Sequence, residues 1–143
     1  MSDAGFAVLA VLLAGAIYRD LRDRSLPNAL MFCGTAAGLV IAAAHGAPAL
    51  WLALCGGFTG ALLLLPLYVA GGMAGGDIKL MGMAGVFLGM PGALYAVTGT
   101  LIAGGLLALG WRFARSTETS MPFAPAIAAG CGVAVWMRVF GAA

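Results

Sequence analysis

The sequence predicts an all-α membrane protein, a polytopic bundle of six transmembrane helices in a single domain over residues 1–143. Two observations predict this class. Hydrophobic residues make up 63% of the chain and charged residues only 8%, a composition typical of proteins that face lipid. The apolar residues also fall into runs that approach the roughly 20 residues needed to cross a hydrocarbon core of about 30 Å. These runs fill nearly the whole length and leave no room for a separate soluble domain.

Six apolar runs define the expected helices, and the breaks between them are rich in charged residues, Gly or Pro, as turns are. The fourth run, of about 13 residues, is short for a crossing and is either a short helix or a re-entrant segment. The runs cover residues 4–18, 26–44, 50–69, 78–90, 93–111 and 123–139.

The basic residues favour a crossing by the fourth run, because Lys and Arg gather in cytosolic loops. Six crossings with both termini outside place nearly all of them on that side. Without the fourth crossing, the basic loop near residue 112 would lie opposite the one near residue 19. We therefore expect a short fourth helix that begins near Gly75. Arg138 remains on the outer side and is expected to snorkel to the interface. The basic residues on the cytosolic side are Arg19, Arg22, Arg24, Lys79, Arg112 and Arg115.

Charge and cysteine content exclude several function classes. The net charge of +2 is small and confined to short loops, so no nucleic-acid surface is expected. Cys33, Cys55 and Cys131 are odd in number, lie in apolar stretches and lack CxxC spacing, which predicts neither disulfides nor a metal site. We expect them to be small apolar filler. The N-terminus has no basic residue ahead of its apolar run, so the first helix is expected to be retained.

Many of the 23 glycines lie inside the apolar runs. Spacings such as Gly34 with Gly38 and Gly56 with Gly60 allow helices to approach closely, which predicts a compact bundle. Because Gly and Ala are so abundant here, these spacings are weak evidence for a dimer, and the oligomeric state stays open.

Two aspartates stand out among only five carboxylates. Asp20 ends the first run in YRDLRDRSLPN, and Asp77 opens the fourth in AGGDIKL. The expected topology places both at the cytosolic membrane boundary. If their helices pack together, the two carboxylates share a proton, since both do not ionise easily in a partly dehydrated site. One then activates water and the other donates a proton, without any cofactor.

Two other functions remain possible for the paired acids, and the glycines beside Asp77 also have two interpretations. Intramembrane acids also serve as proton or cation sites in small transporters or channel subunits, although transport favours acids near the bilayer midplane and inverted repeats. A purely structural assembly protein leaves the paired acids without a role. Around Asp77, Gly75 and Gly76 either let a substrate backbone approach through unusual φ values or form a plain turn before an acid at a helix N-terminus.

Together the two motifs resemble those of the type IV prepilin peptidases, membrane aspartic proteases of the GxGD type. The resemblance is strongest to the short form that serves tight-adherence pili and to the archaeal preflagellin peptidases, and it spans nearly the whole chain. Position 74 is Ala where that family has the first Gly of GxGD. The matching residues are Asp20, Arg22, Leu26, Pro27 and Asn28, followed by Gly76, Asp77, Ile78, Lys79 and Leu80.

The resemblance implies an aspartic endopeptidase of the bacterial inner membrane with Asp20 and Asp77 as its catalytic pair. Its partner is a prepilin-like precursor, from which it removes a short basic leader at the cytosolic face, just after a glycine and ahead of an apolar helix. The paired CxxC region of long-form members is absent, so methyltransferase activity is not implied.

Several neighbours are weaker candidates for a supporting or substrate-binding role. Asp23 is more typical of a solvated loop charge, and Lys79 of an orientation-setting lysine. Asn28 is placed to hydrogen-bond near the site, while Pro27 fits the first position of a helix. His45 is expected in an outer turn away from the aspartates. Gly75 and Gly76 complete this group of candidates.

Overall fold

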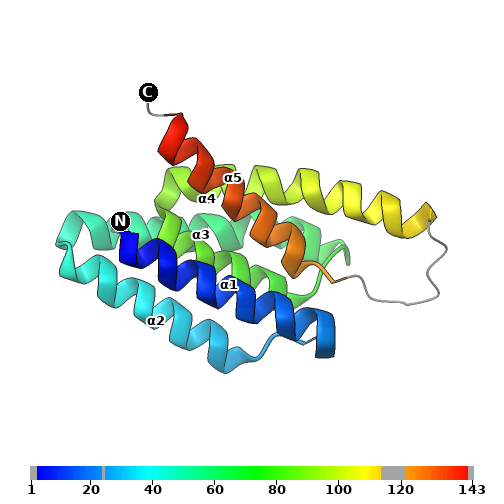
Figure 1. Ribbon diagram of the computed structural model, residues 1–143, viewed down its shortest axis with the longest axis horizontal. Coiled ribbons are helices and arrows are strands. Elements are labelled where there is room, and N and C mark those ends of the chain that lie inside the picture. The colour runs from blue at the N-terminus through cyan, green and yellow to red at the C-terminus, as the bar shows by residue number, and fades with distance from the viewer. Residues whose placement is uncertain (1–2, 24, 114–121, 142–143) are drawn as a thin grey trace.

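The computed structural model describes residues 3–23, 25–113 and 122–141, and those residues form five helices (Figure 1). Arg24 and Arg115, two of the residues used to predict orientation, lie outside the described residues. The helices are α1 (Asp3–Asp23), α2 (Asn28–Ala44), α3 (Ala47–Val69), α4 (Gly75–Phe113) and α5 (Ala124–Phe140).

The all-α prediction is confirmed, but the predicted count of six helices is wrong for the described part of the chain. The fourth and fifth apolar runs both lie in α4, which begins at Gly75 as expected. A turn was predicted at Pro91 and Gly92, yet only Gly89 leaves the helical conformation, with φ of +70° and ψ of 174°. Glycine adopts this left-handed region without a steric penalty, so no loop is needed. Pro91 follows the break, at a position where a backbone N–H would have no partner within the helix, so the N–H that proline lacks costs no helical hydrogen bond.

The two parts of α4 run in opposite directions on either side of Gly89 (Figure 1). One end of the bundle therefore gathers the end of α1, the start of α2, both ends of α4 and the start of α5. Arg19, Arg22, Lys79 and Arg112 all lie on segments at this end, while Arg138 is near the end of α5 at the opposite end. The basic residues named here are thus distributed between the two ends as predicted.

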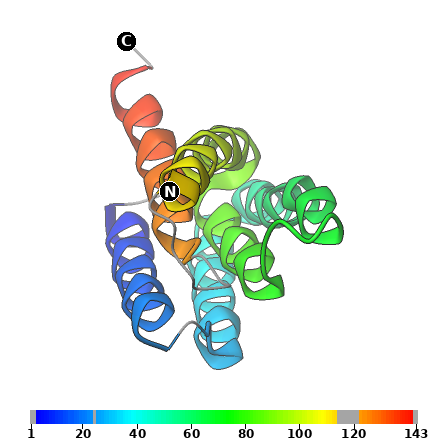
Figure 2. The same ribbon diagram turned by 90° about the vertical axis from the view of Figure 1, so that its right-hand side faces the viewer.

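The first part of α4 forms the centre of the bundle, with α3 and α5 on different sides of it (Figure 2). Its side chains are almost all buried, including Leu80, Met81 and Phe87. On α3, Gly56 lies directly against the backbone of this part of α4. Close approach through glycine was predicted, and here it packs two helices of one chain against each other.

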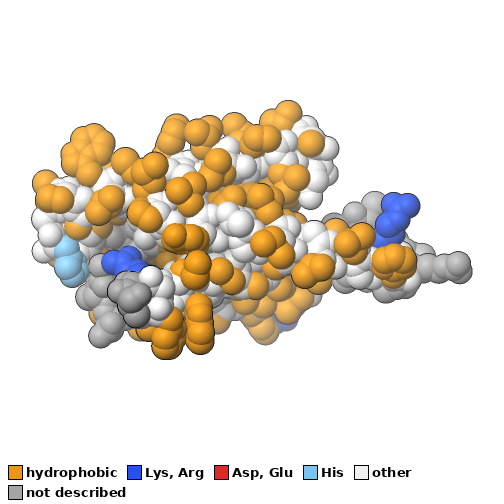
Figure 3. Space-filling view, turned by 90° about the horizontal axis from the view of Figure 1, so that it is seen from above, with side chains coloured by type: hydrophobic (Ala, Val, Ile, Leu, Met, Phe, Trp, Pro, Cys, Tyr) orange, Lys and Arg blue, Asp and Glu red, His pale blue; other side chains and the backbone are white. Residues whose placement is uncertain are grey.

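Large hydrophobic side chains are exposed on each of the five helices, and they cover much of the face seen in Figure 3. Three helices are long and apolar enough to cross a membrane, namely Ala4–Asp23, Ala47–Val69 and Gly75–Gly110. The other two are apolar but shorter, at 17 residues each. Cys33 and Cys55 also face outward, so only Cys131 packs in the core as apolar filler.

Candidate active site

Asp20 lies in the last turn of α1, because this helix continues to Asp23 and does not end with its apolar run. Only 8% of Asp20 is exposed. Its Oδ2 accepts a hydrogen bond of 2.9 Å from the backbone N–H of Ala124, the first residue of α5. That N–H has no partner within its own helix, so the contact satisfies both groups. Asp20 is therefore held by a segment more than 100 positions away in the sequence.

Asp77 is the third residue of α4 and is 4% exposed. Its Oδ2 accepts a hydrogen bond of 3.0 Å from the N–H of Ala74, just before the helix, and its own N–H donates to the Ala74 carbonyl. A side chain at this position that reaches back to the preceding N–H is half of a capping box. Ala74 has no side-chain oxygen to complete the other half. Asp77 thus fixes the start of α4 while its carboxylate remains in the protein interior.

The two carboxylates come together at the same end of the bundle. Asp20 reaches this end along α1 and Asp77 lies where α4 begins, although 57 positions separate them in the chain. Two buried acids brought to the same end of a helix bundle are an arrangement suited to acid and base work.

The segments that follow Asp20 and surround Asp77 are also in direct contact. Lys79 Nζ donates a hydrogen bond of 2.9 Å to Asn28 Oδ1. Gly76 packs against Leu26 so closely that a Cβ added at Gly76 would lie 3.2 Å from the Leu26 Cβ. The sequence indicated each motif separately, and the structure joins them through these two contacts.

Of the two alternatives for Gly75 and Gly76, unusual φ values are excluded, and an acid in the first turn of a helix is observed. Both residues are helical, and the positive φ in this region belongs to Gly71, at +76°, in the turn after α3. Gly75 faces the Tyr68 ring, with a hypothetical Cβ 3.5 Å from its nearest carbon. These two glycines allow neighbouring side chains to pack close to the backbone, and the contact is tighter at Gly76 than at Gly75.

Asp23 stays apart from this pair. Its Oδ2 lies 3.3 Å from Arg19 Nη1 and its Oδ1 lies 3.8 Å from Arg22 Nε, with the side chain 40% exposed. It is the last residue of α1 and not a loop residue, but its charge is solvated as predicted. Pro27 directly precedes α2 and is not its first residue. His45 is at the other end of the bundle, after α2.

One partner of the site was not foreseen from the sequence, namely the start of α5. The donor to Asp20 is a backbone N–H, which any residue but proline carries, so no side-chain signal marks it. As to metals, the described ranges contain no group of three His, Cys, Asp or Glu residues placed to bind an ion.

Comparison with known families shows that residues 7–109 match the type IV leader peptidase family. This range includes both aspartates and both motifs, and it covers more than half of the chain. It confirms the resemblance inferred from the motifs and supports a protease over the transport alternative. Comparisons with curated proteins and with solved structures find no match.

Proposed function

Since the chain belongs to the type IV leader peptidase family, we propose that it is an aspartic endopeptidase whose catalytic pair is Asp20 and Asp77. Membership makes it a membrane protease that acts on prepilin-like substrates in general. The finer proposal is that it removes the short basic leader of such a precursor at the cytosolic face of a bacterial inner membrane.

The observation that carries the proposal is the convergence of two buried aspartates from separate helices. Asp20 and Asp77 are 8% and 4% exposed, and both lie at the same end of the bundle. Among the described residues, neither aspartate pairs with a basic side chain, and each accepts a hydrogen bond from one backbone N–H. Two acids held this way differ from Asp23, which is paired with arginine and exposed. Such a pair favours one shared proton over two charges.

The proposed chemistry divides the work between the two carboxyl groups. The ionised one takes a proton from water as the water oxygen bonds to the scissile carbonyl carbon. The protonated one gives its proton to the carbonyl oxygen, forming a neutral tetrahedral intermediate. When the C–N bond breaks, the leaving nitrogen takes the proton that came from water, and a hydroxyl proton of the intermediate returns to the second carboxylate. The pair is thereby restored without a covalent intermediate.

The surroundings of Asp77 fit the approach of an extended peptide. Ala74, three residues before the buried Asp77, is exposed, and Gly71 and Gly72 precede it in an exposed turn. Small residues leave room for a substrate backbone beside the carboxylate. Because both aspartates are nearly buried, we expect this turn to shift when a substrate enters. The apolar helix of the precursor would then lie along the hydrophobic outer surface of the bundle.

The orientation follows from charge. Arg19, Arg22, Lys79 and Arg112 lie on segments at the aspartate end of the bundle, and basic residues favour the cytosolic side. A leader that carries positive charge stays on that side too, next to Asp20 and Asp77. Attraction between leader and carboxylates would assist positioning of the scissile bond.

The test is co-expression with a prepilin-like precursor, with leader removal scored as a gel shift for wild type, Asp20→Asn, Asp77→Asn and Asp23→Asn. Each of the first two variants is expected to lose about 100-fold or more in rate, the usual contribution of a positioned acid or base. An Asn oxygen still accepts the hydrogen bonds from Ala124 and Ala74, so the fold is retained.

Asp23→Asn is the matched control, because it makes the same chemical change at an exposed aspartate on the same helix. It should process the precursor at close to the wild-type rate. Thermal unfolding in detergent checks that all three variants remain folded. Full processing by folded Asp20→Asn or Asp77→Asn would exclude the proposed pair.

A further inference from the structure

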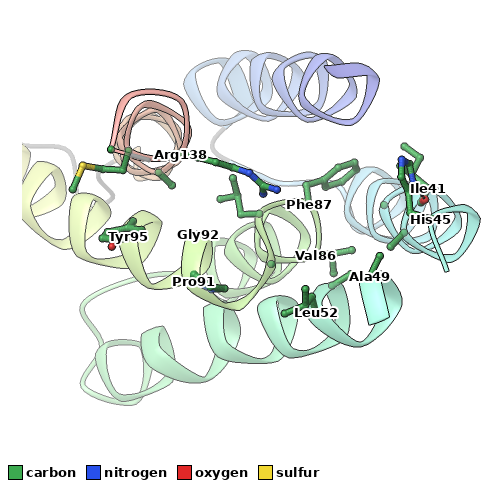
Figure 4. A pocket seen from close by; sticks show the side chains of 18 residues that line it. Ile41, His45, Ala49, Leu52, Val86, Phe87, Pro91, Gly92, Tyr95 and Arg138 are labelled. Atoms are coloured by element: carbon green, nitrogen blue, oxygen red, sulfur yellow. Dashed lines mark hydrogen bonds between the residues drawn. The ribbon is translucent and has the colours of Figure 1, made fainter. Parts of the chain in front are cut away.

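A cavity of about 420 Å³ lies at the end of the bundle opposite the aspartates (Figure 4). It is enclosed by the end of α2, the start of α3, the break in α4 and the end of α5. Its walls are mainly apolar, with Leu52, Val86 and Phe87 among the side chains that form them. This volume is within the range of small-molecule sites, about 300–1,000 Å³. The proposed peptidase chemistry makes no use of it.

Arg138 gives this apolar cavity its charge. Among the lining residues it is the only one with a fixed charge, and its side chain extends from α5 across the cavity toward Phe87 (Figure 4). The Phe6 ring lies below the guanidinium, with its centroid 5.6 Å from Arg138 Cζ. Helix beginnings and helix ends both meet here, so their opposite dipoles largely offset each other. The positive charge of Arg138 therefore makes the cavity attractive to anions.

The cavity is also at a level where a membrane protein meets lipid headgroups. Trp136 and Phe140 flank Arg138 on α5 and are 62% and 59% exposed, and their rings lie 4.2 Å apart between centroids, tilted by 34°. Trp51 is 69% exposed near the start of α3. Tryptophan on the outer surface near helix ends is typical of the membrane interface. Phosphate groups of the bilayer lie at this level, within reach of an exposed arginine.

We propose that this cavity binds one anionic phospholipid of the surrounding bilayer. The headgroup phosphate pairs with Arg138, which supplies a planar set of N–H donors suited to phosphate oxygens. The cavity is too small for a whole phospholipid. It takes the glycerol region and the upper part of one chain, while the rest lies on the apolar surface outside.

This lipid site is separate from the aspartate pair. Ala124, which contacts Asp20, and Arg138 are both on α5, and 14 residues of helix place them about 21 Å apart. Lipid binding can therefore be measured without leader cleavage, and its failure would leave the peptidase proposal untouched. A bound lipid would also join α5 to α2 and α3 across the cavity.

The test is native mass spectrometry of the full chain in nonionic detergent, with phosphatidylglycerol and phosphatidylcholine of identical acyl chains. Wild type should bind phosphatidylglycerol more tightly. Arg138→Gln should weaken that binding about three- to tenfold and weaken phosphatidylcholine binding less, because the choline ammonium already offsets the charge of that phosphate. Arg138→Lys keeps the charge but not the planar set of donors, so it should keep part of the preference. Arg112→Gln is the matched control, since Arg112 is exposed at the opposite end of the bundle.

Two further measurements test whether the apolar cavity takes part in binding and whether the bound phosphate belongs to a lipid or to a free small molecule. Ala49→Phe places a ring in the cavity wall and should weaken binding of both lipids. Free glycerol phosphate, which has no acyl chain, should fail to displace phosphatidylglycerol. The proposal is overturned if Arg138→Gln and Arg112→Gln weaken binding equally, if Ala49→Phe has no effect, or if glycerol phosphate competes as well as the lipid.

Discussion

Replacement of Gly56 by alanine is expected to destabilise the bundle and displace the site, because this glycine lies directly on the backbone of α4. An added Cβ would overlap the Gly85 carbonyl oxygen and lie 2.7 Å from Gly89 Cα. Nonbonded carbon atoms are most favourable at about 3.5 Å or more, so α3 and α4 would have to separate by about 1 Å. Neither contact is with a side chain that rotates away. The strain therefore falls on the two helices themselves.

The expected magnitude comes from a comparison with Gly105→Ala. Gly105 is also on a helix, but no atom lies within 4 Å of its hypothetical Cβ. Both substitutions gain about the same helix propensity, up to about 1 kcal/mol, so their difference isolates the overpacking. Forcing a methyl group into a close-packed contact typically costs about 1–3 kcal/mol. Taking about 2 kcal/mol, Gly56→Ala should unfold about 4–8 °C below Gly105→Ala.

The assay is thermal unfolding of both variants in the same detergent at one scan rate, followed by leader cleavage. Gly56→Ala should also cleave more slowly, because α4 carries Asp77 at its start. Equal unfolding midpoints for the two variants would refute the reasoning that backbone contact between α3 and α4 sets their spacing. A lower midpoint with unchanged cleavage would show that the spacing does not position Asp77.

Two further predictions concern the contact between the motifs. Asn28→Ala removes the acceptor of Lys79 and should slow leader cleavage a few-fold while changing stability by about 1 kcal/mol or less, and Lys79→Met should do the same. If loss of the Lys79–Asn28 hydrogen bond causes the slower cleavage, the double variant should cleave no more slowly than either single variant. Additive losses in the double variant would argue against this explanation. Gly76→Ala should reduce cleavage because Leu26 must move, whereas Gly75→Ala meets only an ordinary contact with Tyr68 and should be nearly neutral. A large loss of cleavage in a stable Gly75→Ala variant would instead indicate that substrate passes over Gly75.

The sequence predicted those parts of the fold that depend on composition and periodicity. Apolar runs placed all the helices, and the basic residues placed Asp20 and Asp77 at one end. The count failed at Gly89 because a helix break that needs one residue leaves almost no polar signal. Pro91 and Gly92 marked the neighbourhood correctly but suggested a loop. The length of α1 was underestimated because polar residues continue a helix once the apolar part has formed it.

The contacts of the site were less accessible from the sequence. Asp20 accepts from a backbone N–H, and Gly76 matters through the position of Leu26, so neither contact depends on residue types that a pattern displays. Lys79 and Asn28 were each named as candidates, but nothing local shows that residues 51 positions apart are bonded. Tertiary packing alone decides such pairs.

The start of α5 contacts the site, although it lies outside the segment that matches the family. The match ends at residue 109, whereas Asp20 is held by Ala124, beyond that end. A backbone donor makes no demand on side-chain identity, so a sequence pattern has no reason to include it. Yet removal of α5 would take away the backbone N–H that donates to the Asp20 carboxylate, and the loss of such a partner typically costs about 1–3 kcal/mol or more. The structural unit that supports the proposed chemistry therefore extends past the matched segment and includes α5.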